Sequence, residues 1–261
     1  MAKKKEEGGI GEFISTVIYA LLIAGVIRTL LFQPFWIPTG SMKSTLLIGD
    51  FLFVNKMAYG YSKHSCPFSL CGFINGRFWA TEPERGDIVV FKHPSSHQDY
   101  IKRLIGLPGD QIQLKDGFLY INGEIAPQTP DGTFEEVFEP QGSLGSRPQC
   151  ANGVVAIGAI CEKERSLETL PNGVEHIVLN IKDANTDNTL VFTVPPGNYF
   201  MMGDNRDNSL DSRVKIENGG VDMVPFENLV GRADRVIFSS AGKSLFFFWT
   251  WRKDRFFKAV N

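Results

Sequence analysis

The first pattern along the chain is a nearly unbroken apolar run at residues 13–32, FISTVIYALLIAGVIRTLLF. About 20 residues, each rising roughly 1.5 Å, cross a hydrocarbon core of roughly 30 Å, so this run predicts one transmembrane helix. Arg28 lies near its carboxyl end, where a long side chain reaches the interface. The alternative is the apolar core of a secretory signal peptide. Bulky Phe35 and Trp36 stand where cleavage requires small side chains, so the sequence favours an uncleaved anchor.

The pattern changes beyond Pro34 to short apolar or alternating runs that end at Gly, Pro, Asn or Asp. Such runs are typical of β-strands separated by turns. Asp116 and Gly117 indicate a tight hairpin, because this pair tolerates the positive φ angles of the turn. No helical period of useful length follows the apolar run. The predicted strands are residues 50–56, 86–94, 99–107, 111–124, 188–195 and 233–240.

Two stretches, residues 60–84 and 125–187, interrupt the succession of strands and predict loops or β-ribbons inserted between core strands. The predicted fold class is therefore mainly β. A tail at 1–12 and a transmembrane helix at 13–32 precede a mostly antiparallel β domain at 33–261, which carries both insertions.

Charge limits the partners of this chain. Its 261 residues carry a formal net charge of -2 with a sequence pI near 6.1, so no broad basic field exists to bind nucleic acid. Lys3, Lys4 and Lys5 precede the apolar run, and only Lys43 follows it closely. This lysine bias favours a cytoplasmic amino terminus, with the bulk of the chain across the membrane.

The four cysteines agree with an oxidising compartment. Cys66 and Cys71 are close in sequence, as are Cys150 and Cys161, which suits two local disulfides. Without nearby histidines, neither spacing supplies enough ligands for zinc, so no metal site and no cofactor is predicted. Four cysteines allow three pairings, and the sequence does not choose among them.

Residues 37–56 open with several hydroxyl side chains around Gly40, Ser41 among them. A serine becomes a nucleophile only when a neighbouring base takes its proton, and histidine is the usual base. Two histidines lie in the insertions and two flank a short proline-containing stretch, so we expect surface or loop roles for all four: His64, His93, His97 and His176.

Lysine is the remaining base. A free lysine amine has a pKa of about 10.4, but burial lowers the pKa by as much as about 3 to 5 units. Lys102 lies in an apolar strand, and strand alternation puts it on the same face as Tyr100 and Leu104. On this pattern alone, a solvated lysine at a strand edge is the simpler interpretation. Ser240 and Lys243 match S-x-x-K, but the S-D-N and K-T-G motifs of penicillin-binding enzymes are missing, so a turn is predicted there.

The stretch GDNRDNSLDSR, residues 203–213, is dense in Asp and Asn. It lacks the glycine and the terminal glutamate of an EF-hand calcium loop, and a plain surface turn is the simple alternative. Its two arginines and three aspartates also suit an ion-pair network that fixes the loop and leaves Ser209 free to orient a neighbour.

Four stretches, in order after the apolar run, resemble the bacterial signal peptidase I family: PTGSM with TLLIGD, RGDIVVFKHP, YIKRLIGLPGD and GDNRDNSLDSR. The resemblance implies a serine endopeptidase with a Ser/Lys dyad, in which Ser41 is the nucleophile and Lys102 the general base. It also implies that Ser209 orients the lysine, and that the Thr39 hydroxyl joins the Ser41 backbone N–H as the oxyanion hole. Thr39 stands where the family often has serine, so its methyl group is a departure.

The resemblance further implies substrates that are exported preproteins cut after Ala-x-Ala, bound as an added strand. The implied partners are signal peptides, the lipid bilayer and the protein-export machinery, and the implied location is the bacterial inner membrane with the β domain on its outer face. The implied supports of the site are Gly40, Arg103, Asp204, Arg206, Asp211 and Arg213. The implied substrate-pocket residues are Phe35, Ile37, Pro38, Met42, Leu46, Leu52, Val89, Tyr100 and Ile101.

Two other functions remain open at this stage. One is a processing peptidase dedicated to a single secretion or conjugation system. The other is an anchored module that binds signal peptides without cutting them, although the presence of both Ser41 and Lys102 disfavours it. The aromatic and basic segment at 244–258 suits either the membrane interface or a final strand with a charged end.

Overall fold

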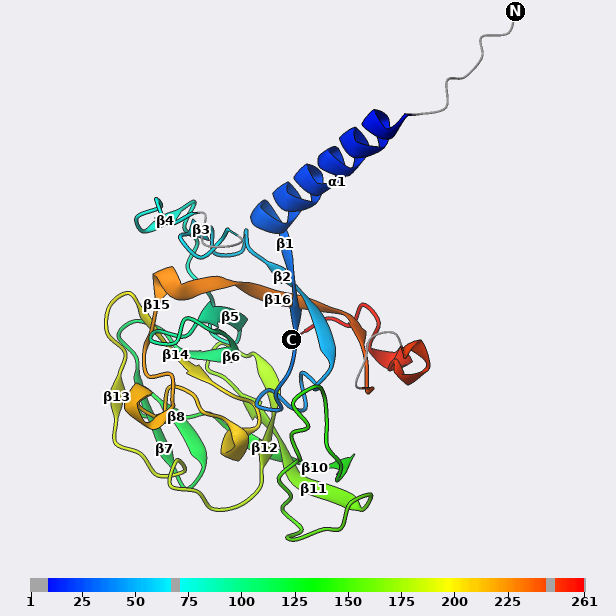
Figure 1. Cartoon of the computed structure of the whole chain (residues 1–261). Coiled ribbons are helices and arrows are strands. Elements are labelled where there is room, and N and C mark those ends of the chain that lie inside the picture. The colour runs from blue at the N-terminus through cyan, green and yellow to red at the C-terminus, as the bar shows by residue number, and fades with distance from the viewer. Residues whose placement is uncertain (1–8, 67–70, 243–246, 261) are drawn as a thin grey trace, which may run out of the picture.

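The computed structural model describes residues 9–66, 71–242 and 247–260 of the chain (Figure 1). A helix, α1 (Ile10–Leu30), extends away from a β-rich body. It begins three residues before the predicted span, and Phe32 already belongs to strand β1 (Phe32–Trp36). Pro34 favours an extended backbone at Gln33, and the pairing with β2 carries the extended backbone back to Phe32. Residues 1–8 of the predicted tail and Lys243 lie outside the described residues.

Helix α1 exposes apolar side chains over its whole length. Leu21, Leu22 and Ile23 are consecutive, so they point to different sides of the helix, and they are 68%, 60% and 61% exposed. A helix that is apolar all round needs an apolar environment. The segment Ile10–Arg28 is long and apolar enough to cross a membrane.

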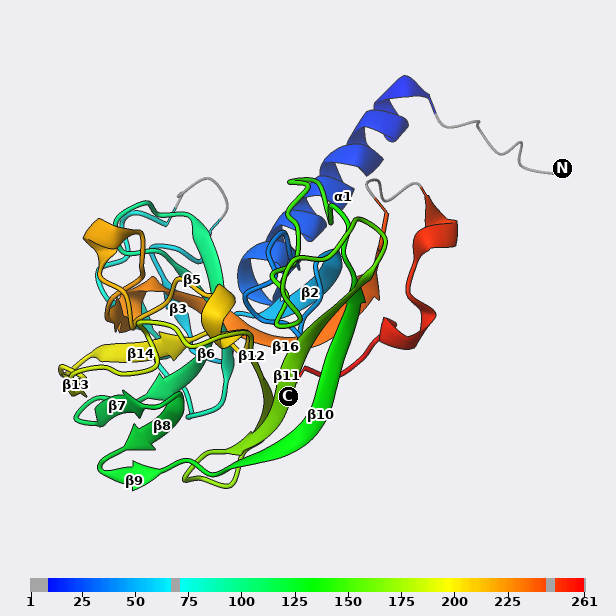
Figure 2. The same ribbon diagram turned by 90° about the horizontal axis from the view of Figure 1, so that it is seen from below.

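The described strands form four antiparallel sheets (Figures 1 and 2). The largest has the order β1-β2-β16-β5-β6-β14-β15, and the others have the orders β10-β11-β12, β13-β7-β8-β9 and β3-β4. The remaining strand bounds are β2 Asp50–Asn55, β3 Tyr61–Ser62, β4 Arg77–Phe78, β5 Ile88–Lys92, β6 Asp99–Gly106, β7 Gln111–Lys115, β8 Phe118–Ile121, β9 Glu124–Ile125, β10 Gln128–Val137, β11 Ile160–Thr169, β12 Glu175–Asn180, β13 Phe192–Thr193, β14 Asn198–Met202, β15 Val224–Pro225 and β16 Leu229–Ser239.

The mainly β fold class is confirmed, and the described helices outside α1 are single 3-10 turns. Five predicted strands correspond to β2, β5, β6, the β7–β8 hairpin and β16. The sixth, at 188–195, is reduced to β13, because only Phe192 and Thr193 pair with β7. The 3-10 turns are Arg206–Asn208, Ile216–Asn218, Phe226–Asn228, Phe248–Thr250 and Lys253–Arg255.

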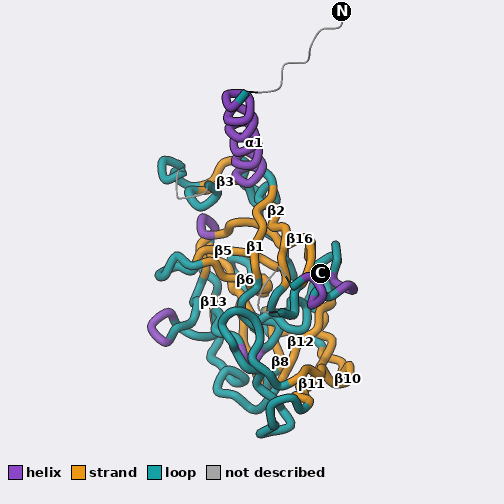
Figure 3. Tube along the Cα trace, turned by 45° about the vertical axis from the view of Figure 1, so that its right-hand side comes forward, coloured by secondary structure: helices purple, strands orange, loops and turns teal. Residues whose placement is uncertain are grey.

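The two predicted insertions take different places. The first contains the β3–β4 hairpin, which lies beside the end of α1 in Figure 3, where the Tyr61 hydroxyl donates a hydrogen bond to the Leu30 carbonyl. The second contains β10, β11 and β12, a long curved sheet seen along its length in Figure 2. The structure pairs the cysteines locally, Cys66 with Cys71 and Cys150 with Cys161.

Surface or loop roles were expected for all four histidines, and two of them are buried. His93 lies in the loop after β5, whereas His176 lies within β12, so the prediction is wrong for His176. His93 and His176 are each 4% exposed. His93 shares a hydrogen bond with the Gly220 carbonyl, and His176 lies 3.3 Å from the Glu168 carboxylate. His93 follows the end of β5 and His176 lies in β12, and in both places a polar partner makes burial possible.

The carboxyl-terminal segment forms short 3-10 turns in the residues that are described, so the alternative of a final strand is wrong there. Arg255 is buried and forms an ion pair with Asp50 at 2.5 Å, which ties this segment to the start of β2. Phe248 and Trp249 remain 69% and 68% exposed, so this end of the molecule presents aromatic surface.

Candidate active site

Ser41 lies in a turn that connects β1 to β2 and is 8% exposed. Asn205, from the loop before the first 3-10 turn, holds this turn in place. Its backbone N–H donates to the Ser41 carbonyl at 3.1 Å, and its side-chain amide donates to the Gly40 carbonyl at 2.9 Å. Asn205 lies within the stretch 203–213, but its neighbours in the sequence do not distinguish it from the other polar residues there. The turn that carries Ser41 is therefore fixed from outside by a buried amide.

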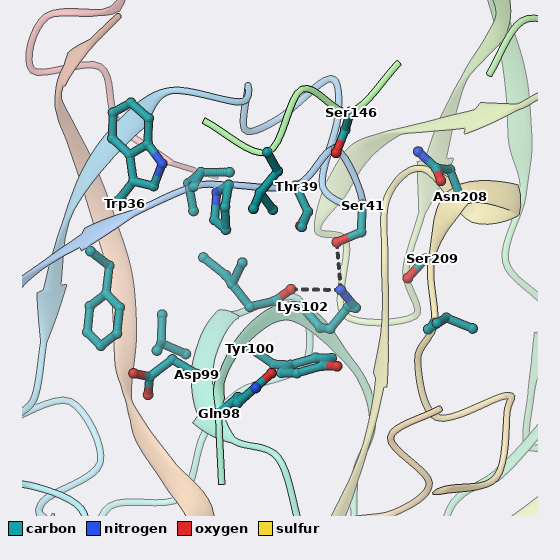
Figure 4. Close-up of a pocket in the computed structure, with 18 of the residues that line it drawn as sticks. Trp36, Thr39, Ser41, Gln98, Asp99, Tyr100, Lys102, Ser146, Asn208 and Ser209 are labelled. Atoms are coloured by element: carbon teal, nitrogen blue, oxygen red, sulfur yellow. Dashed lines mark hydrogen bonds between the residues drawn. The ribbon is translucent and has the colours of Figure 1, made fainter. Parts of the chain in front are cut away.

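Lys102 projects from β6 toward this turn. Its Nζ lies 2.6 Å from Ser41 Oγ and 3.2 Å from the Ile101 carbonyl oxygen (Figure 4). The side chain is only 4% exposed, and its Nζ is 5.7 Å from the centroid of the Tyr100 ring. The structure thus places Lys102 next to Ser41 and buried, whereas the strand pattern alone suggested a solvated edge residue.

Burial lowers the pKa of the Lys102 amine to about 8. The carboxylates of Asp211 and Asp204 act in the opposite direction, and the Arg213 guanidinium adds to the lowering. Burial is the largest of these effects, so a substantial fraction of the amine is neutral near pH 8. A neutral amine accepts a proton, which is the property that a general base needs.

Ser209 and Thr39 lie on either side of this pair (Figure 4). Thr39 is exposed at the cavity that contains Ser41, and Ser209 lines the same cavity. Among the described residues, no hydrogen bond joins the Ser209 hydroxyl to Lys102. Gly203 allows the two loops to meet, because a Cβ there would lie 2.3 Å from Ser209 Oγ and 2.6 Å from the Ser41 carbonyl oxygen.

The charged residues of 203–213 form ion pairs both inside and outside their own loop. Arg213 pairs with Asp211, whose carboxylate also accepts the Gly203 N–H. Asp204 instead pairs with Arg103 of β6 through two contacts of 2.9 Å. The predicted network exists, but it joins several elements in addition to fixing one loop.

Arg206 completes this network with a residue of the second insertion. It forms an ion pair with Glu168 on β11 at 2.5 Å, and both side chains are buried. Burial by itself would raise the pKa of Glu168, but the Arg206 guanidinium and His176 hold the pKa well below its usual range. Glu168 is therefore an anion that anchors the loop of Ser209 to the inserted sheet.

A second carboxylate of the insertion, which is partly buried, supports the turn of Ser41. Glu136 on β10 pairs with Lys43 at 2.5 Å and also with Lys163 on β11. The stem of Lys43 packs close to Gly40, since a Cβ at that glycine would lie 3.1 Å from Lys43 Cε. Sequence reasoning missed these three residues, because their charges are 93 and 27 positions apart and follow no periodic pattern.

An open cavity of about 860 Å³ contains Ser41 and Lys102. Its wall includes five of the nine residues predicted to form substrate pockets: Phe35, Ile37, Pro38, Tyr100 and Ile101. The other four lie in the hydrophobic core and not at the cavity wall: Met42, Leu46, Leu52 and Val89. Val90 lines the cavity in place of Val89. Alternation could not distinguish them, because β5 is buried on both faces.

A buried serine–lysine pair at the floor of an open cavity, on a β-rich body carried by one long apolar helix, defines a membrane-anchored serine hydrolase. The chain belongs to the family described as signal peptidase, peptidase S26, which matches residues 10–238.

Two similar relatives are the signal peptidases I of Rickettsia typhi and Rickettsia akari. The first is 42% identical over 85% of this chain and 78% of its own length, and the second is 41% identical over 85% and 77%. A solved structure of a signal peptidase I from Enterococcus faecalis is 27% identical, covers 58% of this chain and 97% of its own, and has a TM-score of 0.31.

Proposed function

We propose that this chain is a membrane-bound endopeptidase that removes signal peptides from exported preproteins after Ala-x-Ala-type sites. The observation that carries the proposal is the 2.6 Å contact between Lys102 Nζ and Ser41 Oγ inside a buried site. Membership of the signal peptidase family supplies the class of substrate. The apolar helix α1 would hold the chain at the membrane, where such substrates are located.

In the proposed mechanism the neutral Lys102 amine accepts the hydroxyl proton of Ser41 as Oγ attacks the carbonyl carbon of the scissile bond. The Ser41 backbone N–H and the Thr39 hydroxyl donate hydrogen bonds to the resulting oxyanion. Such preorganised donors are worth about 2.7 to 4 kcal/mol each. The Lys102 ammonium then returns the proton to the leaving amine of the mature protein. The same lysine next takes a proton from water, which hydrolyses the ester between Ser41 and the signal peptide.

The supports of the site act through these two residues. Asn205 and the Lys43–Glu136 pair fix the turn of Ser41, and Arg103 with Asp204 fixes β6 next to Lys102. We assign Ser209 the role of orienting the lysine once substrate is bound, since it already lines the cavity at that point. Phe35, Ile37, Pro38, Tyr100 and Ile101 supply the apolar wall that suits small side chains before the cut.

We place the chain in the bacterial inner membrane, with residues 1–12 in the cytoplasm and 33–261 on the outer face. The lysines before α1 support this orientation. Strand β1 begins within two residues of the end of α1, so the site is held near the bilayer surface where a preprotein emerges. The lipid bilayer and the protein-export machinery are the proposed partners.

The test is mass spectrometry of the products released from a model preprotein by the full chain in detergent. The wild-type chain should cut after the second alanine of Ala-x-Ala, and activity should persist in a chelator. Ser41→Ala and Lys102→Met should each abolish cutting, with circular dichroism showing that both variants remain folded. Cleavage by Lys102→Met at the wild-type rate would reject the mechanism.

A further inference from the structure

The cavity has two ends that differ in construction. At one end, two segments converge on the dyad, the residues from Phe35 to Thr39 and those from Gln98 to Ile101. Both run along the chain toward Ser41 and Lys102, as Figure 4 shows by the positions of Trp36 and Asp99. At the other end the wall consists of two loops. One supplies Leu144, Ser146, Arg147 and Gln149, and the other supplies Asp207 to Leu210.

The first of these loops connects β10 to β11 in the second insertion and is fastened on both sides. Gln141 accepts a hydrogen bond from Lys43 at 2.7 Å, which ties the loop to the turn of Ser41. Gln149 donates to Asn208 at 3.4 Å, and the neighbouring Cys150 is joined to Cys161. Ser146 lies directly above Ser41 in Figure 4. The loop is therefore a fixed part of the site.

The position of the membrane assigns a substrate segment to each end, given the proposed function. The apolar part of a signal peptide lies in the bilayer, so the residues before the cut must enter from the membrane side. Helix α1 leads directly into β1, which carries Phe35 and Trp36. The residues after the cut, which belong to the mature protein, must then leave across the loop end.

Outside the dyad, the charged residues at the cavity wall are Asp99, Asp207 and Arg147, and Arg147 is the cation among them. Asp99 forms an ion pair with Lys92 at 2.9 Å. Asp207 accepts the backbone N–H groups of Ile181 and Lys182. Arg147 is exposed, and in the part of the chain that the structure describes no carboxylate pairs with it.

We propose that Arg147 forms a cationic subsite of the insertion that binds an acidic side chain in the first residues after the cleaved bond. Arg147 lines the cavity between Ser146 and Gln149, and Gln149 donates a hydrogen bond to Asn208, so Arg147 belongs to the loop end of the cavity. Arg147 is a specificity determinant here, because it touches substrate without taking part in bond breaking. The assignment deepens the proposed function and rests on it.

The test compares two preprotein peptides that differ only in the first three residues after the bond, which carry glutamates in one and lysines in the other. A third substrate has a chromogenic amine directly after the bond and lacks mature residues. The wild-type chain should favour the acidic peptide by roughly two- to fivefold in kcat/KM, the range of an exposed ion pair. Arg147→Glu should reverse this preference and leave the chromogenic substrate unaffected.

Lys115→Glu is the matched control, because it makes the same charge change on the exposed β7–β8 hairpin away from the cavity. It should keep the wild-type preference. An acidic-to-basic ratio that is the same in wild type and Arg147→Glu would overturn the subsite, while cleavage of all three substrates by wild type would uphold the proposed function. Failure of the wild-type chain to cut any of them would overturn both.

Discussion

At the scale of single residues, Lys102 decides the pH dependence of catalysis. Burial lowers the pKa of its amine to about 8, and only the neutral amine accepts the Ser41 proton. We expect kcat/KM for a peptide substrate to rise about tenfold per pH unit below pH 8 and to level off above it. Initial rates between pH 6 and pH 10 measure this. A profile that is flat from pH 6 to pH 8 would contradict a lysine base.

The same residue should reduce the stability of the folded chain at neutral pH. Lys102 holds its proton up to about pH 10.4 when unfolded but only up to about pH 8 when folded, so the unfolded state binds more protons between these values. Stability from this group therefore increases with pH across that window, and it is lowest below pH 8. The difference between the pKa in the unfolded state and that in the folded state corresponds to a loss of about 3 kcal/mol in the free energy of unfolding below pH 8.

We therefore expect Lys102→Met to be more stable than wild type at pH 7, with the gap narrowing as the pH rises from 8 to 10. Thermal unfolding followed by circular dichroism at pH 7 and at pH 10 measures the difference in stability between the two proteins. Ser41→Ala is the control, because it removes the partner hydroxyl without removing the buried amine. Equal melting temperatures of wild type and Lys102→Met at pH 7 would show that the amine carries no such penalty.

The residues that surround Lys102 show what a sequence can predict at this scale. Alternation along β6 correctly placed Lys102 on the side of Tyr100, because the period of a strand is a local property. The contact with Ser41 joins positions 61 apart, and it was predicted only from the order of four motifs. Asn205 went unnoticed, because nothing local distinguishes an amide that holds a distant carbonyl from one that caps a turn.

At the scale of elements, the inserted sheet β10–β11–β12 supports both catalytic loops through two carboxylates, one buried and one partly buried. Glu136 holds the turn of Ser41 through Lys43, and Glu168 holds the loop of Ser209 through Arg206. Composition predicted four of the seven strands of the largest sheet, β2, β5, β6 and β16, since apolar runs bounded by turn residues mark them locally, and it missed β1, β14 and β15. It predicted the insertion only as loop or ribbon, because its contacts with the site are charge pairs that have no period.

Removal of one such carboxylate should destabilise the whole domain. Glu136→Ala leaves Lys43 and Lys163 buried without a counter-ion, and loss of one partner of a buried pair costs about 3 to 5 kcal/mol. Glu135→Ala is the matched control, because Glu135 is the exposed neighbour on the same strand. Urea unfolding measures the free energy of unfolding for both. A loss in Glu136→Ala no greater than in Glu135→Ala would show that the sheet does not support the site electrostatically.

At the scale of the whole molecule, hydrogen bonds join the end of α1 to the β body. The Lys56 backbone N–H donates to the Leu31 carbonyl, and the Tyr61 hydroxyl donates to the Leu30 carbonyl, so the end of α1 is joined to β2 and to the first insertion. Figure 1 shows the result, in which α1 rises from the same side of the β body as β1 and β2. When enzyme and substrate are both anchored in the membrane, their effective concentration is high only if the active site and the cleavage site lie at the same distance from the bilayer.

Lengthening the connection between α1 and β1 should therefore affect the cleavage of a membrane-bound preprotein but not that of a soluble peptide. Four residues inserted between Leu31 and Phe32 move the β domain away from the bilayer and leave Ser41 and Lys102 untouched. We expect cleavage of a preprotein in proteoliposomes to fall by about fivefold or more, because the effective concentration of the cut site drops. Cleavage of a short soluble peptide in detergent should stay within about twofold of wild type, since that substrate is not fixed at a distance from the bilayer.

The same four residues placed before Gly9, on the other side of the span, should change neither rate. If the four added residues lower the cleavage rate of the membrane substrate equally at both positions, then the distance of the site from the bilayer does not control preprotein cleavage.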